Sequence, residues 1–231
     1  MEKGEVMRER EIDWKQTILF IIGVGLIILL AAGFIEIVEE WKEREIEAFD
    51  STVYSEVNTI TSPGVTEFMK KITFLGGVQW ITVLTGIASI LFFVFKKYSL
   101  GLYVLLTVAL GGGFNWLLKE YFKRQRPDIE ALVEQGGYSF PSGHSMGSFI
   151  LYGALAFAVF RLYDHRWSKF IGAAALLLLV LLIGLSRIYL GVHYPSDILG
   201  GFSAGGVWLA FSILVYTFIK GARPWRKISR A

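Results

Sequence analysis

Three short sequence patterns contain the residue types that phosphate chemistry needs. They are Lys119-x6-Arg126-Pro127, Pro141-Ser142-Gly143-His144 and Ser186-Arg187-x5-His193-x3-Asp197. Together they supply three cations, two histidines, a hydroxyl, a glycine and a carboxylate. Arginine can clamp two phosphate oxygens at once, and lysine adds a point charge. The patterns therefore predict a site that holds a phosphate group and attacks it with a histidine.

The second pattern directly precedes a long apolar stretch, so Ser142 or Gly143 is expected to cap a helix. The start of a helix leaves backbone N–H groups free, and these form an anion site that a glycine lets a phosphate approach closely. His144 would then lie at the lip of that helix, where it could act as a general acid. Taken alone, an ordinary cap and an interfacial histidine would explain the same four residues.

The third pattern places His193 four residues before Asp197, so that one turn would bring them together. A carboxylate on one imidazole nitrogen fixes the tautomer and leaves the other nitrogen with a nucleophilic lone pair. Asp197 could also cap the helix that follows it.

The first pattern places Lys119 at the end of an apolar stretch and Arg126 on a loop, because the residue before a proline is biased toward extended backbone. Both could instead be cations at the membrane edge whose side chains reach toward the headgroups. For the neighbouring Lys123 and Arg124 we prefer this simpler interpretation.

The composition predicts an all-α, polytopic membrane protein with a single domain over residues 1–231. The chain is 54% hydrophobic and 19% charged, with a mean hydropathy of +0.51. A membrane-spanning helix needs about 20 mainly apolar residues. Six stretches without Asp, Glu, Lys or Arg meet or approach this length: Thr17–Ile35, Ile72–Phe95, Tyr98–Leu118, Phe140–Phe160, Phe170–Ser186 and Ile198–Ile219.

The distribution of basic residues predicts the orientation of these spans. If the N-terminus is cytoplasmic, the inner segments carry Lys3, Arg8, Arg10, Lys15, Lys96, Lys97, Arg161, Arg166, Lys169, Lys220, Arg223, Arg226, Lys227 and Arg230. The outer segments then carry Lys42, Arg44, Lys70, Lys71, Lys119, Lys123, Arg124, Arg126 and Arg187. The excess inside favours two cytoplasmic termini. It places all three patterns, residues 119–197, on the extracytoplasmic face.

The segment of residues 39–71, between the first two spans, is expected to form amphipathic helices on the same extracytoplasmic side. Its apolar residues recur at helical spacing: Ile46, Phe49, Val53, Val57 and Ile60. Ser62-Pro63 predicts a cap with proline at the first position of a second helix. The apolar stripe suits either packing against the bundle or a position in the headgroup layer.

The three patterns resemble, position for position, the signature of the type 2 phosphatidic acid phosphatase superfamily of membrane lipid phosphatases. The resemblance implies that His193 is the nucleophile and forms a phosphohistidine, that Asp197 orients it, and that His144 protonates the leaving oxygen. It also implies that the phosphate is held by Lys119, Arg126, Ser142, Gly143 and Arg187.

The sequence is similar to the bacterial branch of this superfamily, which implies a lipid phosphate as substrate. Phosphatidylglycerophosphate and undecaprenyl pyrophosphate are expected first, with phosphatidate and diacylglycerol pyrophosphate as further possibilities. No cofactor, nucleic acid or obligate protein partner is expected. No metal is expected either, because there is no cysteine, the two motif histidines and Asp197 are too few for a catalytic zinc site, and the three clustered cations would repel a metal ion. A lipid transporter or, less favoured, an enzyme resembling vanadium haloperoxidases are the alternatives.

Overall fold

The computed structural model describes residues 14–162 and 165–221 of the chain, and over these ranges it contains eight α-helices and no β-strand. The helices are α1 (Trp14–Glu43), α2 (Glu47–Asn58), α3 (Pro63–Phe74), α4 (Val78–Val94), α5 (Tyr98–Phe122), α6 (Gly143–Leu162), α7 (Arg166–Tyr189) and α8 (Pro195–Gly221).

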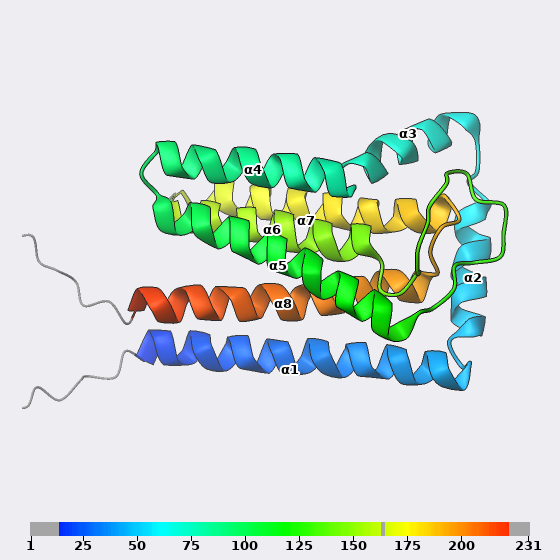
Figure 1. The fold of residues 1–231 in the computed structure, drawn as a ribbon, viewed down its shortest axis with the longest axis horizontal. Helices are drawn as coiled ribbons and strands as arrows, with labels where there is room; N and C mark the ends of the chain where they lie inside the picture. Colours follow the sequence, from blue (N-terminus) through cyan, green and yellow to red (C-terminus); the bar gives the residue numbers. More distant parts are fainter. Residues whose placement is uncertain (1–13, 163–164, 222–231) are drawn as a thin grey trace, which may run out of the picture.

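Five of these helices, α1, α5, α6, α7 and α8, are long and apolar enough to cross a bilayer. Together with α4 they form one bundle of elongated helices (Figure 1). Many of the large apolar side chains that face outward lie on α1, α4, α5 and α7, where lipid would surround them. The expectation of an all-α, multi-pass membrane protein is confirmed.

The second predicted span differs from the expectation, because it is broken. Residues Ile72–Phe95 were expected to form one helix, but α3 and α4 meet at a bend of 46°. Gly77, with extended backbone at φ −70° and ψ 149°, is the N-cap of α4 and separates it from α3. α4 has 17 residues, so it is about 25 Å long and slightly short for a hydrocarbon core of about 30 Å. Among the described residues, a sixth candidate span exists only if the bent pair is taken as one span.

The segment between the first two spans forms α2, which lies across the end of the bundle, and α3, which leads obliquely into α4 (Figure 1). Ser62 caps α3 by accepting a hydrogen bond from Val65 N–H, and Pro63 takes the first position, as predicted. Val57 packs with Met69 against the end of α7 and the loop after it. Phe49 remains 42% exposed. The apolar stripe is therefore only partly used for packing within the chain.

α6 is the central helix and packs against α4, α5, α7 and α8. The N-terminal end of α1 and the C-terminal end of α8 lie at one end of the bundle (Figure 1). At the other end lie α2, α3 and the loops of residues 123–142 and 190–194. Aromatic rings secure this second end, since Phe140 contacts Phe34, Trp41 and Phe122. All three sequence patterns are gathered there.

Candidate active site

The third pattern forms a histidine–aspartate pair at the start of α8. His193 Nδ1 lies 3.2 Å from Asp197 Oδ2, and the two residues are 2% and 0% exposed. Asp197 is the third residue of α8 rather than its cap. Its carboxylate still serves the helix start, since Oδ2 accepts the backbone N–H of Tyr194 at 3.0 Å. A carboxylate so placed makes Nδ1 the protonated nitrogen of the imidazole.

Arg126 lies at the other nitrogen of the same ring. Its Nη1 is 3.2 Å from His193 Nε2. Because a guanidinium can only donate, Nε2 presents a lone pair. The remaining N–H groups of Arg126 donate to backbone carbonyls of the surrounding loops: Gly136, Gly137, Tyr138 and Val192. Arg126 is therefore held in place beside the candidate nucleophilic atom.

Two further cations approach the same histidine. Burial lowers the pKa of His193 well below its usual value, and the charges of Arg187, Arg126 and Lys119 lower it further. Of the three cations predicted from the sequence, Arg126 contacts the imidazole, while Arg187 and Lys119 act on it through their charges, and all three favour the neutral ring. Lys119 Nζ, at the end of α5, donates to the carbonyls of Tyr138 and Ser139.

Arg187 is nearly fully buried at the end of α7. Its two terminal nitrogens donate to Thr73 Oγ1 at 2.7 Å and Gln135 Oε1 at 2.8 Å. Its Nε has no hydrogen-bond partner among the described residues. A buried N–H without an acceptor is costly, and a phosphate oxygen would satisfy it.

The second pattern begins α6, as predicted. Ser142 caps the helix, since its Oγ accepts from the backbone N–H of Ser145 at 3.3 Å. Its own N–H donates to the carbonyl of Asp197, which ties the starts of α6 and α8 together. Gly143 faces α5, where a Cβ would meet Asn115 Oδ1 at 3.1 Å and Lys119 Cε at 3.8 Å. The turn therefore brings the backbone at Gly143 against the end of α5.

His144 follows in the first turn of α6 and faces the break between α3 and α4. A Cβ on Gly77 would lie 3.8 Å from His144 Nε2. The ring lies close enough to Arg187, Arg126 and Lys119 for their positive charges to act on it. The structure thus gathers Lys119, Arg126, Ser142, Gly143, His144, Arg187, His193 and Asp197 at one end of the bundle.

Arg124 contradicts the interpretation made from the sequence. It was expected to be a membrane-edge cation, but it is only 6% exposed and donates to both Asp197 and Asp50. The physical reason is the end of α5, where Lys123 adopts a left-handed conformation at φ 51° and turns the chain inward. Asp50, Ser196, Thr73 and Gln135 also support the site and belong to no recognisable pattern.

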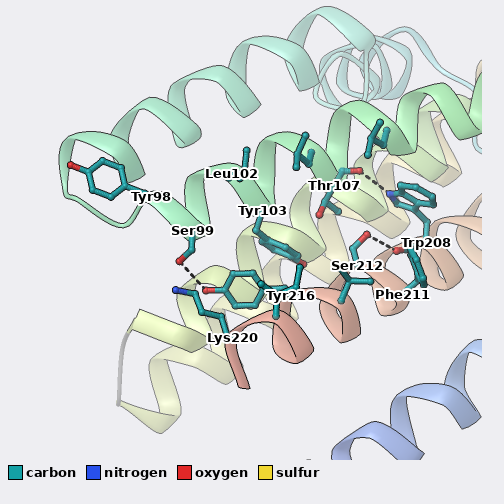
Figure 2. Close-up of a pocket in the computed structure, with 14 residues that line it drawn as sticks. Tyr98, Ser99, Leu102, Tyr103, Thr107, Trp208, Phe211, Ser212, Tyr216 and Lys220 are labelled. Atoms are coloured by element: carbon teal, nitrogen blue, oxygen red, sulfur yellow. Dashed lines mark hydrogen bonds between the residues drawn. The ribbon is translucent and has the colours of Figure 1, made fainter. Parts of the chain in front are cut away.

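Two cavities differ in their position relative to the motifs. One of about 450 Å³ lies between α5 and α8, is lined mostly by apolar side chains, and has Tyr98 and Lys220 toward the end opposite the motifs (Figure 2). No motif residue lines it. The other, of about 620 Å³, lies beside the histidine and is lined in part by Trp41, Asp50, Arg124, His193 and Tyr194. Of the eight gathered residues only His193 lines the second cavity, which therefore adjoins the site on the side of Asp50 and Arg124.

Comparisons with known proteins agree with this geometry. Residues 100–220 match the family described as the PAP2 superfamily. The chain is 33% identical to phosphatidylglycerophosphatase B of Bacillus subtilis, over 76% of this chain and 84% of that protein. It is 23% identical to the undecaprenyl-diphosphatase of Sulfolobus acidocaldarius, over 94% of this chain and 95% of that protein.

A solved structure shows the same fold. The crystal structure of the transmembrane PAP2 type phosphatidylglycerolphosphate phosphatase from Bacillus subtilis superposes with a TM-score of 0.71 at 30% identity. The match covers 92% of this chain and all of that chain. The family match includes the region of the three motifs, and the structural match extends to most of the remaining helices. The chain belongs to the PAP2 superfamily, the superfamily of membrane lipid phosphatases that its three motifs resemble.

Proposed function

We propose that this membrane lipid phosphatase transfers the terminal phosphoryl group of its substrate to Nε2 of His193 and then to water. In the first step the Nε2 lone pair forms the N–P bond, the P–O bond to the lipid breaks, and His144 gives its proton to the leaving oxygen. In the second step water attacks phosphorus, His144 takes the water proton, and the N–P bond breaks. Phosphate is released and His193 returns to its starting state.

One observation carries this proposal: the two nitrogens of His193 have opposite partners. Asp197 accepts from Nδ1, while Arg126 donates toward Nε2. The ring is therefore neutral, in a fixed tautomer, with its lone pair directed at the cations. Phosphoryl transfer depends above all on positioning and on stabilising charge on the phosphoryl oxygens. Arg126, Lys119 and Arg187 would supply that charge, and Ser142 and Gly143 would shape the start of α6 against the phosphate.

The substrate we favour is phosphatidylglycerophosphate or undecaprenyl pyrophosphate. Relatives named for both reactions align with most of this chain. The site also lies at the end of a bundle whose outer surface is apolar, so a substrate with acyl or prenyl chains can remain in the bilayer while its phosphate reaches His193.

The test is a comparison of kcat/KM for the purified protein on long-chain and water-soluble substrates. The panel contains phosphatidylglycerophosphate, undecaprenyl pyrophosphate, phosphatidate, diacylglycerol pyrophosphate and glycerol 3-phosphate, with His193→Gln as the control for contaminating phosphatases. Each buried methylene contributes about 0.8 kcal/mol, so the lipids should be strongly preferred. Equal efficiency on glycerol 3-phosphate would contradict a lipid substrate.

A second test concerns metal ions. In the ranges that the structure describes, no three His, Asp or Glu side chains are grouped so that they could hold a metal ion. We therefore expect activity to survive EDTA, and expect vanadate or tungstate to inhibit by occupying the phosphate position. Loss of activity with EDTA that a divalent ion restores would contradict the mechanism.

A further inference from the structure

A chain of buried charges lies behind the candidate nucleophile, on the side away from Arg126. It runs from His193 through Asp197 and Arg124 to Asp50, which lies on α2. The three charged groups are 0%, 6% and 4% exposed. Because removing one partner from a buried ion pair leaves an uncompensated charge, each group depends on its neighbours.

Arg124 forms the centre of this chain. Its Nη1 donates to Asp197 Oδ1 and to Ser196 Oγ, both at 2.8 Å. Its Nη2 donates to Asp50 Oδ2 at 2.9 Å. The guanidinium also lies over the ring of Tyr194, 4.2 Å from the centroid, and 5.4 Å from that of Trp41. A planar fork between two carboxylates and two rings fits arginine and not lysine.

Asp50 joins the amphipathic helix α2 to the start of α8. Its Oδ1 accepts the backbone N–H of Ser196 at 2.8 Å, and its Oδ2 accepts Ser196 Oγ–H at 2.7 Å. With Arg124 Nη2, the carboxylate therefore uses both oxygens. Ser196 directly precedes Asp197, so Asp50 fixes the turn that presents Asp197 to His193.

The charges of this network suit the proposed reaction. Asp50, Arg124 and Asp197 together carry one net negative charge, located on the Nδ1 side of His193. When Nε2 bonds to phosphorus, the imidazole gains positive charge, which the network would stabilise. Asp197 alone would be costly to keep ionised in a fully buried position. Arg124 offsets that cost, and Asp50 in turn balances Arg124.

We propose that Arg124 and Asp50 are positioning residues for the nucleophile, acting through Asp197, so that docking of α2 onto α8 completes the active site. This inference rests on the proposed role of His193. It assigns a function to the segment between the first two spans, which contains none of the sequence motifs. Neither residue is expected to touch the phosphate, since both lie on the Nδ1 side of the ring.

The first measurement compares Asp50→Asn with Glu56→Gln, a matched control that removes an exposed carboxylate from the same helix. An amide offers one acceptor oxygen where Asp50 uses two, so the Ser196 turn loses a bond. We take as a guide the loss of about tenfold to a hundredfold that follows removal of the hydrogen-bond partners of metal-bound histidines. We expect that loss in kcat for Asp50→Asn with KM and vanadate inhibition nearly unchanged, because the three cations remain. Glu56→Gln should behave as the unchanged protein.

The second measurement is a double-mutant cycle with Asp197→Asn. If Asp50 acts only through Asp197, adding Asp50→Asn to Asp197→Asn should cause no further loss of kcat. Multiplicative losses, or a kcat for Asp50→Asn equal to that of Glu56→Gln, would overturn the proposal. If His193→Gln and Asp197→Asn themselves retain activity, the proposed function fails instead, so the two failures are distinguishable.

Ser196→Ala provides a variant that keeps every charge of the network. It removes only the hydroxyl that links Arg124 to Asp50. We expect a smaller loss of kcat in the same direction, again absent in the Asp197→Asn background. Thermal unfolding in detergent checks that each variant is folded. Full activity of folded Ser196→Ala together with additive behaviour of Asp50→Asn would show that the network is structural only.

Discussion

The two motif histidines have different surroundings. His193 is bonded at both ring nitrogens, to Asp197 and to Arg126. The ring of His144 has no hydrogen-bond partner among the described residues and faces Gly77 at the bend between α3 and α4. A neutral ring that is held by hydrogen bonds at both nitrogens suits a nucleophile. A ring without such partners suits an acid that must reach the leaving oxygen of the substrate.

His144→Ala tests the acid role through the leaving group. Removal of the acid should lower kcat by about a hundredfold or more on a lipid phosphate, whose alkoxide needs a proton to leave. The loss should be much smaller on p-nitrophenyl phosphate, because nitrophenolate leaves without protonation. The measurement is the ratio of kcat values, variant to unchanged protein, on the two substrates.

The control for this comparison is His193→Gln, which should lose activity equally on both substrates. An equal loss for His144→Ala on both substrates would assign His144 to binding or to activation of water alone.

At the scale of the elements, the site depends on how closely α6 and α8 cross. A Cβ on Gly201 would lie 2.9 Å from the carbonyl oxygen of Ser142 and 3.0 Å from Ser145 Cβ. Because one contact is with backbone, the helices would have to separate. The same crossing carries the hydrogen bond from Ser142 N–H to the carbonyl of Asp197. The glycine therefore allows the start of α6, with the second motif, to pack closely against the start of α8, with the third motif.

Gly201→Ala is accordingly expected to lower both the melting temperature and kcat. Small-to-large changes at a packed contact typically cost about 1–3 kcal/mol. Gly112→Ala, on α5, is the matched control, since nothing lies within 4 Å of its Cβ position. We expect the control to retain its Tm and activity, measured by thermal unfolding in detergent and by phosphate release. A stable, fully active Gly201→Ala would show that the crossing tolerates separation.

Much of this architecture could be predicted from the sequence, because it depends on local signals. Apolar length located the spans, Ser62 was a recognisable cap, the second motif predicted a cap at Ser142 or Gly143, and the spacing of His193 and Asp197 predicted one turn. The bend at Gly77 was missed because the apolar pattern continues through it. Arg124 was misinterpreted because its direction depends on the left-handed residue that precedes it. Asp50 could not be found, since its partners lie far away in sequence.

At the scale of the whole molecule, the remaining prediction concerns orientation. The N-terminal end of α1 and the C-terminal end of α8 lie at the end of the bundle opposite the motif loops (Figure 1). The excess of basic residues on the side of the termini predicts that this side is cytoplasmic. Several of those basic residues, including Lys3 and Lys227, lie outside the described residues. The site would then act on the outer leaflet.

Single cysteines test this orientation, because the chain has no native cysteine. Glu130, in the loop after the first motif, and Lys97, between α4 and α5, are both exposed and form no part of the site. A membrane-impermeant maleimide on intact cells should label Glu130→Cys and spare Lys97→Cys. Permeabilised cells, in which both should react, provide the control. The reverse pattern in intact cells would place the site on the cytoplasmic face.

The central claim is that His193 carries the phosphoryl group during turnover, and rapid quenching measures this directly. The enzyme is mixed with a lipid phosphate carrying ³²P in its terminal group and quenched in base, which preserves a P–N bond that acid would hydrolyse. The account predicts transient, acid-labile label on the peptide that contains His193, and none on folded His193→Gln. Label on another residue, or normal turnover by His193→Gln, would contradict it.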